Sequence, residues 1–290
     1  MKERTMRTLL AVALALAVVV PGAQAASLNI YTNCMLLPWG TFGPAGVTTA
    51  VGLTSRSDGA VEWAFFDEDG DRQDDGRFQI ESDELRGITL DGVLNPALAG
   101  TTGFMLFCLD SNEDGVIDSN DAPNLVANAF YVDLNNADVA YLPVWSLPYS
   151  ALDVDTPEDW DEEPVAIIPL LAAVAGHSLD MQYLVDGTIG TGDNTRVIIF
   201  TTDEPSLQVS MQAIGPGGQV GVDVELPNSR LNVVDVESID EIADLTGLRP
   251  SGYLRWSIPV NAGSVVAFSL VSSPAFGALQ TLIGNWSTLP

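Results

Sequence analysis

The feature that most constrains the fold of this chain is an alternation of apolar and polar residues with a period of two. From residue 207 to residue 213, Leu, Val, Met and Ala alternate with Gln and Ser, and from residue 220 to residue 226 Val and Leu alternate with Gly, Asp and Glu. Because successive side chains of a strand point to opposite faces, this period predicts strands with one buried face. The Gly-Pro-Gly-Gly sequence at residues 215–218 predicts the turn of a hairpin between them.

Comparable patterns predict further strands at residues 47–54, 60–66, 104–109 and 254–258, and a more fully buried strand at Val265–Val271. Ser57-Asp58-Gly59 is a turn signal that joins the first two of these strands. Short strands separated by turn residues predict an all-β protein. Its expected architecture is an antiparallel β-sandwich, either one large sandwich or two smaller ones.

Few segments favour a helix. The sequence from Ser238 to Glu241 has the pattern of a capping box, and Gly247 supplies a stop, so we expect one helix of about two turns between them. Residues 167–176 fit either a buried strand or an Ala-rich helix.

Residues 1–25 have the features of a secretory signal peptide. Lys2, Arg4 and Arg7 precede an apolar run from Leu9 to Val20, and the small residues of Ala23-Gln24-Ala25 suit cleavage. The run is shorter than the roughly 20 apolar residues that a membrane-spanning helix needs, and no later segment is long and apolar enough to span a bilayer. We therefore expect an exported protein that is periplasmic, attached to the cell surface or extracellular, without a transmembrane segment after cleavage.

Two cysteines remain in the expected mature chain, Cys34 and Cys108. In an oxidising compartment the simplest arrangement of such a pair is one disulfide. Two buried thiols are the alternative.

The balance of charge excludes several classes of partner. The chain has 39 acidic and 11 basic residues, and removal of the signal peptide deletes three of the basic ones, including its only lysine. Such an acidic protein repels nucleic acids and anionic membranes, so neither is an expected partner. The charge suits divalent cations and solubility in salt, and an extracellular protein or a glycan is the partner class that remains open.

A composition shift divides the chain. Residues 153–164, DVDTPEDWDEEP, are acidic, contain two prolines and offer little to bury, so we expect a linker or a surface loop there. On this basis residues 26–152 form an N-terminal β-sandwich and residues 165–290 form a C-terminal β-rich domain. A single continuous sandwich with a long acidic loop is the alternative.

The twelve residues from Asp110 to Asp121 carry the clearest chemistry. Calcium prefers six to eight hard oxygen ligands, which this loop offers at regular offsets. Gly115, at the sixth position, allows a sharp turn at positive φ, and Ile117 is expected to pack inward. The predicted Ca²⁺ ligands are the side chains of five residues and one backbone carbonyl: Asp110, Asn112, Asp114, Val116 (carbonyl), Asp118 and Asp121.

This loop resembles the EF-hand loop, and more closely its variant in dockerin modules, where Asp commonly holds position 12. The resemblance implies a bound calcium ion and covers these twelve residues only. Asp121 replaces the usual bidentate Glu, which implies modest affinity, and no second loop is present, so a cohesin-type partner is not implied. The preceding segment reads as a strand, whereas residues 122–127 could start a short helix.

A structural role for the ion is favoured over a sensing role, because a sensor needs a pair of helices that opens on binding. A second acidic run, Asp67 to Asp75, places Gly70 at the fourth position and so departs from the EF-hand pattern. It fits a solvated hairpin tip better than an ion site, although calcium in another arrangement is an alternative.

No catalytic pattern stands out. His177 is the only histidine, no Gly-x-Ser-x-Gly elbow is present, and the expected mature chain has no lysine. The abundant acids leave a carboxylate-pair glycosidase open without naming a pair. The function expected from the sequence is therefore a non-catalytic, calcium-binding surface or secreted module that binds a partner or matrix. A calcium-stabilised carbohydrate-binding or glycoside-cleaving protein is the alternative.

Overall fold

The fold is known from a computed structural model. It describes residues 31–43, 46–92, 95–115, 117, 120–147, 177–185, 192–202, 208–215, 218–228, 230–244, 251–257, 265–273, 278–283 and 285–288. The predicted signal peptide, the acidic segment 153–164 and the ambiguous segment 167–176 lie outside these residues.

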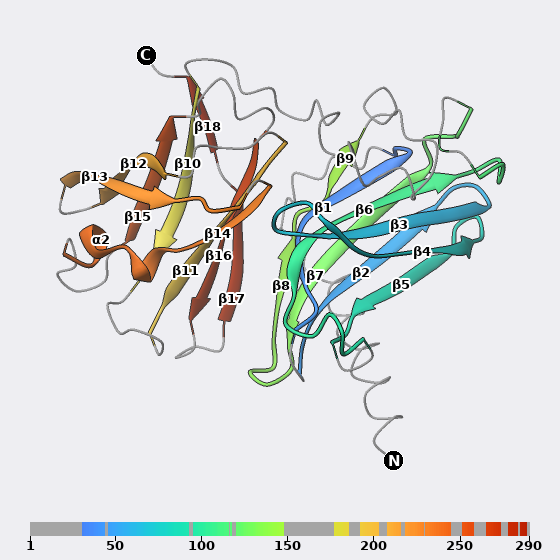
Figure 1. Ribbon diagram of the computed structural model, residues 1–290, viewed down its shortest axis with the longest axis horizontal. Coiled ribbons are helices and arrows are strands. Elements are labelled where there is room, and N and C mark those ends of the chain that lie inside the picture. Colours follow the sequence, from blue (N-terminus) through green and yellow to red (C-terminus); the bar gives the residue numbers. More distant parts are fainter. Residues whose placement is uncertain are drawn as a thin grey trace.

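The N-terminal half contains two antiparallel sheets (Figure 1). Sheet I has the order β5(Leu85–Leu90), β2(Val47–Ser55), β7(Leu125–Asp133), β8(Asp138–Leu142). Sheet II has the order β4(Arg72–Ile80), β3(Gly59–Asp67), β6(Thr102–Asp110), β1(Cys34–Thr41), β9(Trp145–Leu147).

The C-terminal half contains two further antiparallel sheets. Sheet III has the order β14(Leu231–Asp235), β11(Asn194–Thr201), β16(Val265–Ser273), β17(Ala278–Ile283). Sheet IV has the order β13(Gly218–Glu225), β12(Gln208–Gly215), β15(Ser251–Ser257), β10(His177–Leu184), β18(Asn285–Thr288). The described helices are the 3₁₀ helix η3(Val236–Ser238) and α2(Asp240–Asp244), and neither is long and apolar enough to cross a membrane.

The all-β, antiparallel sandwich predicted from the sequence is confirmed. Strands β12 and β13 form the expected hairpin, with Gly215 opposite Gly218 on either side of the turn. Strand β16 is buried from Val265 to Val271, as its continuous apolar sequence predicted.

One predicted connection has a different role. A turn does follow β2, but β2 pairs with β5 and β7 in sheet I, whereas β3 pairs with β4 and β6 in sheet II. The segment around Asp58 therefore carries the chain from one sheet to the other and does not close a hairpin. This is how the two facing sheets of a sandwich are linked.

The predicted helix is present as α2, but its start differs from the expected capping box. The hydroxyl of Ser238 donates to the carbonyl of Asp235 at 2.7 Å, and the Asp235 side chain accepts from the amide of Glu237 at 3.1 Å. Ser238 is therefore the last residue of η3, where its hydroxyl bonds to Asp235, and it does not cap α2.

Two apolar clusters hold the sheets together. The first lies within sheets I and II and also includes Phe200 and Phe268 of sheet III, and the second lies between sheets III and IV. The ring of Phe200 meets that of Phe104 edge-on at 5.0 Å, and Phe268 lies against Trp145. Sheet III is therefore buried on both faces, so the two halves of the chain share an apolar interface.

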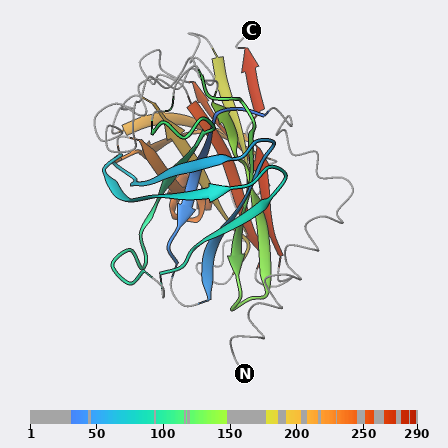
Figure 2. The same cartoon turned by 90° about the vertical axis from the view of Figure 1, so that its right-hand side faces the viewer.

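The edges of the two halves also meet. Strand β8 of sheet I and strand β17 of sheet III lie side by side, as Figures 1 and 2 show. The hydroxyl of Thr281 donates to the backbone carbonyl of Tyr141 at this seam.

Candidate metal centre

Strand β6 carries the first predicted ligand, Asp110, to the end of sheet II. Every residue from Gly103 to Asp110 is buried, because both faces of this strand are covered. The Asp110 side chain is 0% exposed, although its carboxylate is a charged group that is rarely buried without a partner. This burial makes the hydrogen-bonding of its two oxygens informative.

The two oxygens of Asp110 have unlike surroundings. Its Oδ2 accepts from Nη2 of Arg77 at 3.2 Å and from the amide of Gly115 at 3.1 Å. Its Oδ1 is buried and has no hydrogen-bond partner. A buried acceptor without a donor costs about 1–3 kcal/mol, and more when it is charged, so a bound cation at this atom would lower that cost.

A second buried carboxylate shares the same guanidinium. Nη1 of Arg77 lies 3.0 Å from Oε1 of Glu62, which sits beside it on β3 and is also buried. Burial raises the pKa of Glu62, and the positive charge of Arg77 only partly opposes this effect. Two carboxylates thus face one arginine, which leaves a formal charge of −1 in a buried place when both are ionised.

The last predicted ligand, Asp121, is buried as well. Its Oδ1 accepts from the amide of Ser111 at 2.7 Å and from the hydroxyl of Ser111 at 3.1 Å. The same hydroxyl accepts from the amide of Ala122 at 2.7 Å. These bonds tie the end of the loop to its beginning.

The middle of the loop is exposed and locally ordered. Asn112 Nδ2 donates to Asp114 Oδ2 at 2.9 Å, and Asn112 Oδ1 accepts from the amide of Asp114 at 3.0 Å. Gly115 has φ +86°, so the positive φ predicted for this position is confirmed. Ile117 is buried in the first apolar cluster, as predicted.

Four of the six candidate ligands are among the described residues. Asp110, Asn112, Asp114 and Asp121 are described, whereas Val116 and Asp118 lie outside the described residues. Among the residues that the structure describes, no three acidic, histidine or cysteine side chains converge as a metal-binding group. The candidate ligands are hard oxygens, which calcium prefers. The Oδ1 atom of Asp110, which has no hydrogen-bond partner, is the acceptor at which an ion would bind.

The elements around the loop differ from those of an EF-hand. Strand β6 enters the loop, as expected, but the segment after it forms β7 from Leu125 onward and not the short helix expected at residues 122–127. The residues of β7 alternate between the apolar interior and the outer face of sheet I, so burial against sheet II outweighs the local helix preference.

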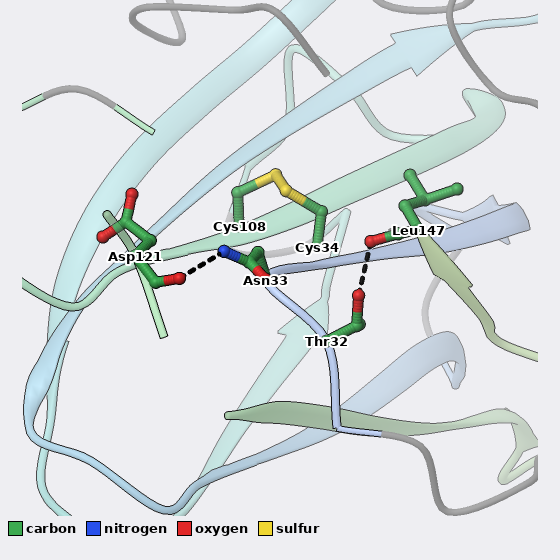
Figure 3. Close-up of a disulfide and its surroundings, with 6 residues drawn as sticks. All are labelled: Thr32, Asn33, Cys34, Cys108, Asp121 and Leu147. Atoms are coloured by element: carbon green, nitrogen blue, oxygen red, sulfur yellow. Dashed lines mark hydrogen bonds between the residues drawn. A yellow bond between two sulfur atoms is a disulfide. The ribbon is translucent and has the colours of Figure 1, made fainter. Parts of the chain in front are cut away.

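The predicted disulfide between Cys34 and Cys108 is present, and its two residues lie directly opposite each other on β1 and β6 (Figure 3). It closes a 74-residue separation, which is worth ~4–5 kcal/mol in the chain-entropy account. The bond lies two residues before Asp110, so it anchors the strand end from which the loop departs.

Asn33 joins the disulfide to the loop, and sequence reasoning missed it. Its Nδ2 donates to the backbone carbonyl of Asp121 at 2.8 Å (Figure 3). The backbone carbonyl of Asn33 accepts from the amide of Leu109 at 2.8 Å. The hydroxyl of Thr32, the residue before Asn33, donates in the opposite direction, to the carbonyl of Leu147 on β9. The only sequence signal for Asn33 is its position next to Cys34, because its contacts depend on the pairing of β1 with β6.

The second acidic run forms a turn between β3 and β4. Oδ1 of Asp67 accepts from the amides of Asp69, Gly70 and Asp71 at 3.0–3.1 Å. Strand β4 begins at Arg72, so the last residues of the run belong to this strand. Asp67 thus acts as the hydrogen-bond acceptor that closes this turn.

An acidic cleft of about 370 Å³ lies between β13, β14 and α2 in the C-terminal half. Its carboxylates come from Asp223, Glu225, Asp235, Asp240 and Glu241. The Asp235 carboxylate already accepts from Asn194 Nδ2 at 3.0 Å and from Glu237. His177 starts β10 of sheet IV, and its side chain lies outside the described residues.

Comparisons with known proteins do not place the chain in a family. No protein-family model matches it, and no curated protein matches it. Among solved structures, the apo form of a Pleurotus ostreatus lectin aligns over 90% of this chain and 79% of that chain, with 13% identity and a TM-score of 0.24.

Two seed proteins align with lower scores. The 7S globulin of Momordica charantia covers 81% of this chain and 72% of that chain, with 8% identity and a TM-score of 0.14. The vicilin of Corylus avellana covers 85% and 80%, with 9% identity and a TM-score of 0.14. At these TM-scores none of the three carries an argument about this chain.

Proposed function

We propose that this chain is an exported, non-catalytic protein whose β-sandwich is stabilised by one calcium ion bound in the loop from Asp110 to Asp121. The observation that carries the proposal is the carboxylate of Asp110, which is fully buried and has one oxygen without a hydrogen-bond donor. An ion at this oxygen removes the cost of the unmet acceptor.

Charge and ligand type favour calcium as this ion. Asp110 and Glu62 share the single guanidinium of Arg77, so a further positive charge is favourable there. The ligands would be the carboxylates of Asp110, Asp114, Asp118 and Asp121, the amide oxygen of Asn112 and the carbonyl of Val116. All are hard oxygens, which Ca²⁺ prefers over the nitrogen and sulfur ligands of zinc.

The position of the loop favours a structural role for the ion. The loop connects β6 of sheet II with β7 of sheet I, so it spans the two faces of the N-terminal sandwich. An ion that ties Asp110 to Asp121 holds these two sheets together at one end. Both flanking elements are strands in the core, and neither is free to open as the helices of a sensor do.

The expected biological setting is the surface of a cell, the periplasm or the medium, with a protein or a glycan as partner. The signal-peptide sequence and the disulfide support export, because disulfides persist in oxidising compartments. The net charge of −28 disfavours nucleic acids and anionic membranes as partners.

Calcium titration of the mature chain by calorimetry tests the proposal. We expect one site with a Kd of about 10⁻⁴ to 10⁻³ M, the range of extracellular calcium modules. Asp110→Asn keeps the shape of the side chain and removes its charge, so it should abolish binding. Asp71→Asn, in the other acidic turn, removes the same charge and should bind as the wild type does. Equal binding by both variants would refute the proposed site.

A further inference from the structure

The pairing of β1 with β6 gives Asn33 a special position. Its backbone carbonyl holds Leu109, the residue before Asp110, and its side chain holds the carbonyl of Asp121. One residue therefore contacts both the strand that leads into the loop and the residue at the end of the loop. Figure 3 shows the second of these contacts. Asn33 is itself buried, so water does not compete for these two bonds.

Asn33 is also covalently next to the disulfide. Cys34 follows it in the chain, and Cys108 lies opposite Cys34 and precedes Leu109. As long as the disulfide is closed, the ends of β1 and β6 stay in register, and Asn33 stays within reach of the loop. When the disulfide is reduced, only non-covalent contacts keep Asn33 in this position.

We infer that Asn33 is a positioning residue that couples the Cys34–Cys108 disulfide to calcium binding. This inference rests on the proposed calcium site. Reduction of the disulfide lowers the affinity of the loop for calcium, because Asp110 and Asp121 are then less firmly placed relative to each other. Coupling between two equilibria is reciprocal, so calcium in turn stabilises the closed disulfide.

The burial of the disulfide makes the reciprocal effect measurable as a rate. Cys34 and Cys108 are both buried, so a reducing dithiol reaches the sulfurs only when the ends of β1 and β6 open. A dithiol such as dithiothreitol breaks the S–S bond by thiolate attack, forms two protein thiols and becomes a cyclic disulfide itself. Calcium that ties the loop ends together disfavours the opening and slows this reduction.

Thr32 provides a matched control. It directly precedes Asn33 in the chain, is equally buried, and makes a side-chain hydrogen bond to the carbonyl of Leu147 on β9, away from the loop. Asn33→Leu and Thr32→Val each remove one buried hydrogen-bond donor and keep a side chain of similar size. Only the first removes a bond to the calcium loop.

The test uses the mature, oxidised chain with three measurements. Calcium affinity is measured by calorimetry for the wild type, Asn33→Leu, Thr32→Val and Cys34→Ser/Cys108→Ser. The rate of reduction by dithiothreitol is measured with calcium and with EDTA. Circular dichroism in EDTA verifies that each variant is folded.

We expect about tenfold weaker calcium binding for Asn33→Leu, the size of effect that the loss of one buried hydrogen bond produces. The double serine variant should also bind calcium more weakly, because the ends of β1 and β6 are no longer covalently joined. Thr32→Val should bind within about twofold of the wild type. Calcium should slow reduction of the wild type several-fold and that of Asn33→Leu much less. If Asn33→Leu does not fold, the wild-type reduction rates and the calcium affinity of the double serine variant still test whether the disulfide is coupled to calcium binding.

The possible failures are distinct. If the oxidised wild type binds calcium, but the double serine variant binds it equally well and calcium leaves the reduction rate unchanged, the coupling is wrong and the calcium site stands. If Thr32→Val loses as much affinity as Asn33→Leu, Asn33 has no special role. If the oxidised wild type binds no calcium, the proposed function fails and this inference fails with it.

Discussion

The side chain of Asn228 donates to Oε2 of Glu68 at 2.7 Å, across 160 residues of sequence. Glu68 belongs to the turn between β3 and β4 in the N-terminal half, and Asn228 precedes β14 in the C-terminal half. The backbone carbonyl of Glu68 also accepts from the amides of Arg230 and Leu231. The acidic turn of one half is therefore docked on the other half, next to the apolar contact of Phe200 with Phe104.

This contact predicts a pH-dependent effect of one substitution. Burial raises the pKa of Glu68 above its ordinary value of 4.5, and the hydrogen bond from Asn228 only partly opposes this. A raised pKa means that the folded state holds the proton more tightly than the unfolded state. Ionisation of Glu68 therefore lowers the free energy of unfolding as the pH rises through and above 4.5.

Glu68→Gln keeps an acceptor for Asn228 and removes the charge. It should raise the unfolding midpoint at pH 7, and the difference from the wild type should vanish near pH 3.5, where both side chains are neutral. Glu225→Gln, which removes an exposed charge on β13, controls for the general benefit of a lower net charge. A lower midpoint for Glu68→Gln than for the control at pH 7 would contradict the prediction.

In the absence of calcium, Arg77 is expected to supply the positive charge next to the buried carboxylates. Arg77→Met leaves the buried carboxylates of Asp110 and Glu62 without their guanidinium, which should cost about 2 kcal/mol in EDTA, less than for a fully buried pair because Arg77 is 41% exposed. The loss should shrink in calcium, since the ion then supplies the positive charge.

Denaturant titration in EDTA and in calcium measures both values. Arg86→Met is the matched control, because Arg86 forms a 3.7 Å surface pair with Glu84 and should cost under about 1 kcal/mol in either condition. An equal loss for Arg77→Met in both conditions would mean that the ion does not act at Asp110.

Phe200 is expected to stabilise both halves of the molecule. It is buried against Phe104, which stacks on Phe66 at 5.0 Å, so Phe200→Ala should cost about 3–5 kcal/mol. Because the apolar cluster extends across sheets I, II and III, the loss should lower a single unfolding transition. Calorimetry that shows only part of the transition shifted, with the remainder at the wild-type temperature, would contradict this.

Local patterns in the sequence predicted several of the strands but not their partners. The alternation at residues 207–226 predicted the β12–β13 hairpin because the two strands are adjacent in sequence and joined by glycines. The same reasoning did not reveal that β2 and β3 lie in different sheets, because a short polar turn serves either connection. Residues 122–127 were expected to start a short helix, and burial in the sandwich places them in β7 from Leu125 onward.

The candidate site was predictable only as far as it is contiguous. The regular spacing from Asp110 to Asp121 predicted the candidate ligands, and the expected export predicted the disulfide, which is present. Arg77, Glu62 and Asn33 come from three other strands or strand ends. Their approach to the loop depends on the register of β4 with β3 and on the register of β3 and β1 with β6. No local pattern encodes that register.

The most direct test of the central claim is thermal unfolding of the mature wild type and of Asp110→Asn, each in excess EDTA and in 10 mM calcium. For a Kd of about 10⁻⁴ M, binding to the folded state alone adds about 2.7 kcal/mol. In a domain of this size that raises the wild-type midpoint by roughly 5–10 °C, and Asp110→Asn should show no rise. An unchanged wild-type midpoint, or an equal rise in the variant, would contradict a calcium ion at Asp110.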